Sequence, residues 1–213
     1  MKRRVLGVAV AACVLGVSTG SVGAATSLTL PVGAATSLTR AGVPEAGIVV
    51  SYPAQWIRVP LGAPNTETAL EAMQAQDPQA NRARLTGWLD LSAARQPNFF
   101  AVDGRSGDLL LVIVRHDDFD EAFSGTSMKQ LKRELKAEAQ REGARLVSVH
   151  RTMVGSRAAY RWLSKLDDVG IRTETLAFAH SVTNATITVS VSTDDDYPGR
   201  QVAAMILDSV QLA

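Results

Sequence analysis

The densest run of candidate metal ligands in this sequence is HDDFDE, at residues 116–121. His116, Asp117, Asp118 and Asp120 offer one imidazole and three carboxylates, which are ligand types that Zn²⁺ and Ca²⁺ accept. The run lacks the alternating ligands and the turn glycine of an EF-hand loop. Two interpretations stay open, a metal site and a solvated loop. We favour the solvated loop, because runs of charge usually face water.

A second acidic group, Asp194, Asp195 and Asp196, precedes Tyr197-Pro198 and a helical pattern. Carboxylates at this point cap the helix and interact favourably with the positive end of its dipole. The alternative is a cation site shared with His116, which requires the two loops to be neighbours. A metal-dependent or hydrolytic extracytoplasmic enzyme built on these residues is our alternative function.

Three tryptophans, Trp56, Trp88 and Trp162, can either line an apolar ligand groove between a sheet and its helices or pack in the core. Core packing is the commoner use of tryptophan in a domain of this size. The sequence contains no Gly-x-Ser-x-Gly, His-Glu-x-x-His or Gly-x-Gly-x-x-Gly motif. We therefore assign no catalytic residue and no cofactor.

The first 25 residues have the three-part layout of a secretory signal peptide. A basic start, MKRR, precedes a 13-residue apolar run at 5–17, which is too short to span a membrane, and then a small-residue segment with a cleavage site near Ala24 or Ala25. The octamer VGAATSLT occurs at 22–29 and again at 32–39. We predict a signal peptide at 1–25 and a mobile small-residue tail at 26–46.

Cys13 is the only cysteine, and it lies inside the apolar run. A lipidated cysteine is normally followed by polar residues, whereas VLGV continues the apolar run here. We therefore expect plain secretion rather than a lipid anchor at Cys13. The mature chain then contains no cysteine and no transmembrane span.

Removal of the signal peptide leaves 19 Lys and Arg against 21 Asp and Glu, a net charge of −2. A basic patch of the kind that nucleic acid needs does not follow from this balance, so we predict no nucleic-acid partner.

The residues from 47 to 213 form a single domain in which strands outnumber helices. Apolar and alternating runs predict strands at 47–52, 55–59, 99–102, 109–114, 145–154, 158–167, 171–180 and 185–193. Helices are predicted after Asn65, after Asp77-Pro78, at 128–142 behind Ser127, and at 199–209. Strands linked by hairpins, with helices inserted, predict an α+β fold in which helices flank an antiparallel sheet.

The segments IVVSYPAQWIRV at 48–59, GSRAAYR at 155–161 and AAMILDSV at 203–210 resemble parts of the PsbP-like (Mog–PsbP) superfamily. Within it, the chain looks most like the secreted actinobacterial LpqN/LpqT-type envelope proteins. The resemblance spans about residues 47–212. It implies an α/β/α sandwich and a role in protein binding or at the cell envelope, and it provides no set of catalytic residues.

From these observations we predict a secreted, non-catalytic cell-envelope accessory protein. Its partner is expected to be an envelope protein or an apolar small molecule.

Overall fold

A computed structural model describes residues 37–116, 127–180 and 185–213 of the chain. Its strands form two sheets, of which the larger has seven strands in the order β3-β4-β5-β9-β8-β7-β6 with every pair antiparallel. These strands are β3 (Ile57–Arg58), β4 (Phe99–Val102), β5 (Leu109–Arg115), β6 (Arg145–Val154), β7 (Arg157–Leu166), β8 (Ile171–His180) and β9 (Ala185–Asp194). The predicted α+β class and the antiparallel sheet are therefore confirmed.

The smaller sheet has the order β1-β2-β10, with β1 at Leu38–Val43, β2 at Ile48–Pro53 and β10 at Gln211–Leu212. A single turn of 3-10 helix, η1 (Pro44–Ala46), joins β1 to β2. Strand β1 lies inside the range 26–46 for which the sequence predicts a mobile tail, so the prediction is wrong for residues 38–46. Strand β1 pairs with the next strand, β2, and Ala41 and Val43 are buried in the largest apolar cluster together with residues of β9 and α5, which orders a segment whose own residues carry little apolar surface. Residues 26–36 lie outside the described part.

The helices of the described residues are α1 (Thr66–Gln76), α2 (Arg82–Arg95), α4 (Met128–Arg141) and α5 (Tyr197–Asp208). Asn65 and Ser127 cap α1 and α4 as predicted, by accepting hydrogen bonds from the backbone N–H groups of Thr68 and Gln130. Helix α2 begins later than predicted, with Asn81 as its cap. The Asp77 carboxylate instead accepts from the backbone N–H of Gln79 in a turn that precedes the helix.

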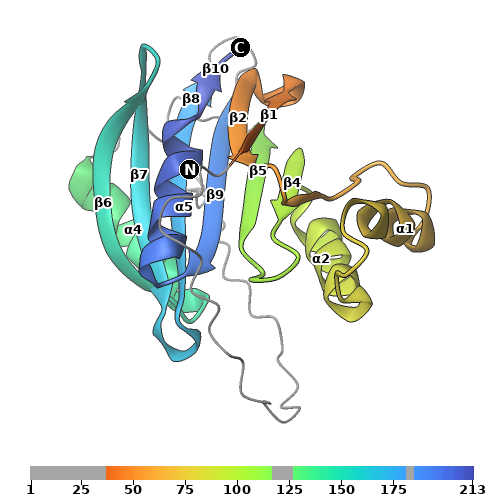
Figure 1. Ribbon diagram of the computed structural model, residues 1–213. Helices are drawn as coiled ribbons and strands as arrows, with labels where there is room; N and C mark the ends of the chain where they lie inside the picture. The colour runs from red at the N-terminus through yellow and green to blue at the C-terminus, as the bar shows by residue number, and fades with distance from the viewer. Residues whose placement is uncertain (1–36, 117–126, 181–184) are drawn as a thin grey trace.

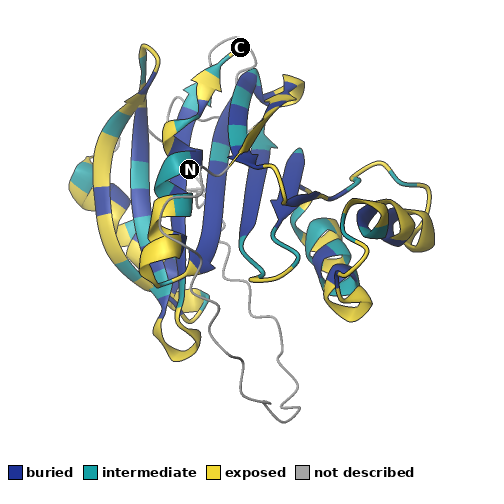
Figure 2. Ribbon diagram, viewed as in Figure 1, coloured by how far each residue is buried: buried dark blue, intermediate teal, exposed yellow. Residues whose placement is uncertain are grey.

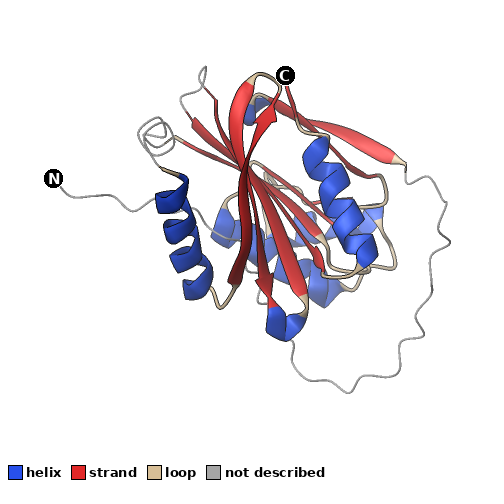
Figure 3. Cartoon of the chain, turned by 90° about the vertical axis from the view of Figure 1, so that its left-hand side faces the viewer, coloured by secondary structure: helices blue, strands red, loops and turns tan. Residues whose placement is uncertain are grey.

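Helices cover both faces of the large sheet (Figures 1 and 3). One face, which we call the α5 face, packs against α5 and the small sheet in the largest apolar cluster, which includes Leu110, Val189, Ile206 and Val50. The other face, the α4 face, carries three apolar clusters. One lies under α1 and α2, and two lie under α4, of which the smaller joins Ala139 of α4 to Leu166 of β7.

Strand β9 is buried on both of its faces, although only one of them is apolar (Figure 2). Ile187, Val189 and Val191 point to the α5 face, as the alternation in the sequence predicts. Of the residues that point the other way, Thr186, Ser190 and Ser192 are buried as well, and the hydroxyl groups of Ser190 and Ser192 pair with β8. The Thr173 and Ser192 hydroxyl oxygens lie 2.8 Å apart, and those of Thr175 and Ser190 lie 3.1 Å apart. We call these residues, together with Ser164 on β7, the hydroxyl seam.

Candidate functional site

The structure does not bring His116 and Asp194 together. His116 follows the last residue of β5, whereas Asp194 is the last residue of β9. Since β5 and β9 are antiparallel, Asp194 meets the opposite end of β5, where its backbone N–H donates to Asp108 at 3.3 Å. Eight residues of extended chain, about 25 Å at the usual rise, separate Asp108 from His116. The shared cation site of the enzyme alternative is therefore not formed.

The other predicted metal ligands divide into two groups. Asp117, Asp118 and Asp120 lie outside the described residues. Asp196 caps α5, as predicted, by accepting a hydrogen bond of 2.7 Å from the backbone N–H of Gly199. Among the described residues, no group of three or more His, Cys, Asp or Glu side chains is placed to hold a metal ion.

The three tryptophans lie in three different apolar clusters rather than around one groove. Trp56 belongs to the cluster on the α5 face, Trp88 to the cluster of α1 and α2, and Trp162 to the cluster under α4. Each is at most 4% exposed. They do not form the apolar ligand groove that the sequence offers as one of two uses, and core packing is their role.

One carboxyl group in the described residues has a strongly shifted pKa. Burial raises the pKa of Asp108 to about 6, and the nearby carboxylates of Asp103 and Asp194 act in the same direction, against hydrogen bonds with Ser106 and with the backbone of Asp194. A raised pKa means that the folded state binds this proton more tightly than the unfolded chain does. The contribution of Asp108 to stability is therefore most favourable below about pH 4 and is lost as the pH rises to about 6.

Replacing Asp108 with asparagine should raise the free energy of unfolding at pH 7. The amide carries no charge to desolvate, and its oxygen still accepts the hydrogen bond from the backbone of Asp194. We expect a gain of about 1–3 kcal/mol at pH 7 that vanishes at pH 4, measured by urea unfolding of both proteins at the two pH values. An equal difference between variant and wild type at both pH values would contradict this account.

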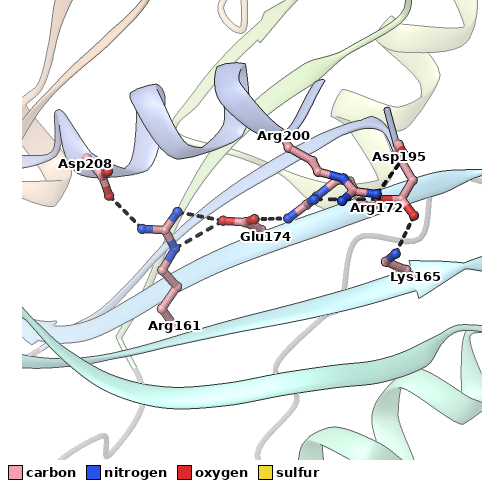
Figure 4. A network of polar contacts seen from close by, with 7 residues as sticks. All are labelled: Arg161, Lys165, Arg172, Glu174, Asp195, Arg200 and Asp208. Atoms are coloured by element: carbon pink, nitrogen blue, oxygen red, sulfur yellow. Dashed lines mark hydrogen bonds and ion pairs between the residues drawn. The ribbon is translucent and has the colours of Figure 1, made fainter. Parts of the chain in front are cut away.

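A network of ion pairs lies on the α5 face beneath α5 (Figure 4). At its centre is Glu174 on β8, whose carboxylate accepts from Arg161 Nη2 at 2.7 Å and Nε at 3.2 Å, and also pairs with Arg172. The side chains of Glu174 and Arg172 are only 12% and 8% exposed. Arg161 extends the network to Asp208 at the end of α5, at 2.6 Å.

The other end of this network is organised by Asp195, which follows β9. Its carboxylate pairs with Lys165, with Arg200 at 3.2 Å and with Arg172 at 3.7 Å. The hydrogen bond from Lys165 holds the pKa of Asp195 below its ordinary value, and Arg200 acts in the same direction. Asp195 therefore ties β7, β8 and α5 together.

Positive charge is concentrated in one part of the fold, formed by α4, β6 and β7. Residues 128–166, which form α4, β6 and β7, contain ten Lys and Arg against three Glu, whereas the rest of the chain contains twelve Lys and Arg against eighteen Asp and Glu. Helix α4 packs against β6, and β6 pairs with β7, so these elements adjoin one another (Figure 1). We call this surface the basic side.

Much of this positive charge is not compensated within the described residues. Six of the ten cations form no ion pair with another residue in that part of the chain. These six are Lys129, Lys132, Arg133, Lys136, Arg151 and Arg157. The overall charge of the sequence hides this feature, since an acidic remainder cancels a basic segment. Counting charge along the chain in windows would have found it.

Comparisons with known proteins give no family for this chain. No model of a protein family matches it, and no curated protein matches it. Two similar solved structures are the Ran-binding protein Mog1p of Saccharomyces cerevisiae, with 8% identity and a TM-score of 0.46, and a point mutant of the protein Mog1, with 7% identity and a TM-score of 0.45. Each match covers 83% of this chain and 96% of the other. Similarity at this level carries no argument about function, and membership of the LpqN/LpqT-type branch stays a prediction.

None of the described helices is long and apolar enough to cross a bilayer.

Proposed function

We propose that this protein is an exported, non-catalytic accessory protein of the cell envelope that binds an acidic protein partner through its basic side. The observation that carries the proposal is the separation of charge between residues 128–166 and the rest of the chain. A surface rich in uncompensated cations attracts anionic surfaces and accelerates their association. Export is supported by the signal-peptide pattern of residues 1–25.

A protein fits this surface better than the other partners considered. An apolar small molecule needs an apolar groove, and the tryptophans offered for that role are buried in separate clusters. A long nucleic acid would extend beyond the basic side onto a remainder that, without the signal peptide, has nine more acidic than basic residues and repels it. A protein segment with a local cluster of acids matches a basic surface of limited size.

Capture from envelope extract with matched charge variants tests the proposal. The bait is the secreted mature protein, whose N-terminus is first established by mass spectrometry and expected at Ala25 or Thr26. We expect a defined envelope protein to be enriched at low salt and released as the salt concentration rises. The double variant Lys132→Glu/Lys136→Glu on α4 should lose this protein.

The control is Arg40→Glu/Arg105→Glu, which changes the net charge equally at exposed positions away from the basic side. It should retain the partner. Equal loss in both variants would show that net charge, rather than the basic side, governs capture. A stoichiometric lipid found by mass spectrometry in the purified protein, with no protein partner captured, would favour the apolar-ligand alternative.

A further inference from the structure

Strand β6 is a long edge strand with an exposed surface. It ends the seven-stranded sheet and has ten residues, whereas the other edge strands of the two described sheets, β1, β3 and β10, have six, two and two. Figure 2 shows β6 largely exposed, in contrast to the buried β5 and β9. Its exposed apolar residues include Met153, at 58%, and Val147, at 42%. An edge of this kind is a template for pairing with another chain.

The hairpin register identifies the backbone groups that β6 offers at its free edge. Val154 pairs with Arg157 across the two-residue turn Gly155-Ser156, and Gly155 has a φ of 56°, as the first position of a type II′ turn requires. The pair that closes such a turn is hydrogen-bonded, and bonded pairs then alternate along the ladder. Residues 153, 151 and 149 therefore direct their N–H and C=O groups away from β7.

The positive charge of the β6–β7 hairpin favours a partner with acidic side chains. Residues 145–166 contain four Arg, one Lys and one His, and no Asp or Glu. Arg145, Arg161 and Lys165 pair with acidic residues outside the hairpin, which leaves Arg151 and Arg157 without an ion pair among the described residues. Arg151 lies on the free edge with its guanidinium 5.9 Å from the centre of the Tyr160 ring, and it forms no ion pair with a described residue. If β6 paired with β6 of a second copy, two hairpins that each carry five Lys and Arg and no Asp or Glu would be brought together, which like charges disfavour.

From these features we infer that an extended, acidic segment of the partner protein adds to β6 as an eighth strand of the large sheet. Backbone hydrogen bonds to residues 149, 151 and 153 supply the pairing, and the cations of the hairpin and of α4 select acidic side chains. The inference rests on the proposed function, because it assigns the mode of binding at the same basic side. Electrostatic attraction alone would bind any polyanion. Backbone hydrogen bonds at the edge of β6 require a polypeptide partner.

Backbone-modified peptides test strand addition with the wild-type protein. The probe is a labelled ten-residue peptide of alternating Glu and Thr, and its affinity for the mature protein is measured by fluorescence anisotropy at low salt. Two derivatives carry N-methyl groups at the odd or at the even residues. A strand bonds to its neighbour through alternate residues only, so we expect one derivative to lose about tenfold or more in affinity and the other to stay within about twofold.

Two variants locate the contact on β6. Met153→Pro removes an outward N–H without changing charge or removing a bond to β7, and should weaken peptide binding about tenfold. Met153→Ala removes the same side chain but keeps the N–H, and should bind as the wild type does. If Met153→Pro does not fold, the N-methyl comparison still decides the question.

Three outcomes would overturn the inference. Equal binding of both N-methyl derivatives, with weakening by Lys132→Glu/Lys136→Glu, would leave the basic side as a binding surface but remove strand addition. Absence of any peptide binding at low salt would also remove it, while the capture experiment would test the proposed function independently. A dimer in solution that Met153→Pro dissociates would assign the edge to a second copy.

Discussion

Replacing Trp162 with alanine is expected to destabilise the domain by about 3–5 kcal/mol, as large-to-small changes in a core do. Trp162 is 1% exposed and fills the space between β7 and α4, where it packs with Leu131, Leu135 and Val149. Alanine would leave a cavity that the surrounding strands and helix cannot close. The measurement is chemical unfolding followed by circular dichroism.

Two substitutions of Trp162 that remove different side-chain volumes test whether the loss of stability comes from the lost volume rather than from a lost hydrogen bond. The indole N–H of Trp162 has no hydrogen-bond partner among the described residues, so Trp162→Phe removes less volume and no observed hydrogen bond, and should cost less than the alanine variant. Met153→Ala, at an exposed position of the same hairpin, should leave stability nearly unchanged. A wild-type unfolding midpoint for Trp162→Ala would show that this ring does not hold α4 to the sheet.

Replacing Glu174 with alanine is expected to cost about 3–5 kcal/mol, because it leaves a buried cation without its closest counter-charge. Arg172 would keep only Asp195, at 3.7 Å, and Arg161 would keep only Asp208 at the end of α5. The loss should exceed the small contribution of one hydrogen bond, since a buried guanidinium cannot recover its hydration. Urea unfolding at neutral pH measures it.

Two further variants test whether the loss of stability in Glu174→Ala comes from a buried cation left without a partner rather than from the loss of any ion pair. Arg145→Ala breaks an ion pair with Asp167 in which both side chains are more than half exposed, and it should leave the midpoint nearly unchanged. Adding Arg172→Leu to Glu174→Ala should restore part of the lost stability by removing the unpaired cation. If the double variant is less stable than Glu174→Ala, the desolvated charge is not the cause.

Local chemistry made much of this fold predictable. Asn65, Ser127 and Asp196 cap their helices because a short polar side chain satisfies an N–H that the helix leaves open, which needs no distant partner. The hairpin from 145 to 166 could be located because Gly155-Ser156 interrupts two runs of strand residues. These features depend on residues within a few positions of one another.

Features that depend on distant residues were not predictable in the same way. Ala41 and Val43 of β1 are buried with residues of β9 and α5, and the Glu174 network needs residues of β7, β8 and α5 to meet. His116 and Asp194, offered as parts of one metal site, are separated by the antiparallel pairing of β5 with β9, which the residues around them do not specify. The basic side was present in the sequence, but a single sum of charge concealed it.

The hydroxyl seam has a consequence for how the domain opens. It runs between the apolar cluster under α1 and α2 and the clusters under α4, so α4 and the pair α1–α2 rest on the sheet without sharing a common apolar cluster. Loss of packing under one of them is not transmitted directly to the other through apolar contacts. The ion pair of Arg95 on α2 with Glu142 at the end of α4, at 3.7 Å, is a contact that joins the two parts. We therefore expect the helical layer on this face to open as two units, each unfolding locally while the strands between them keep their pairing.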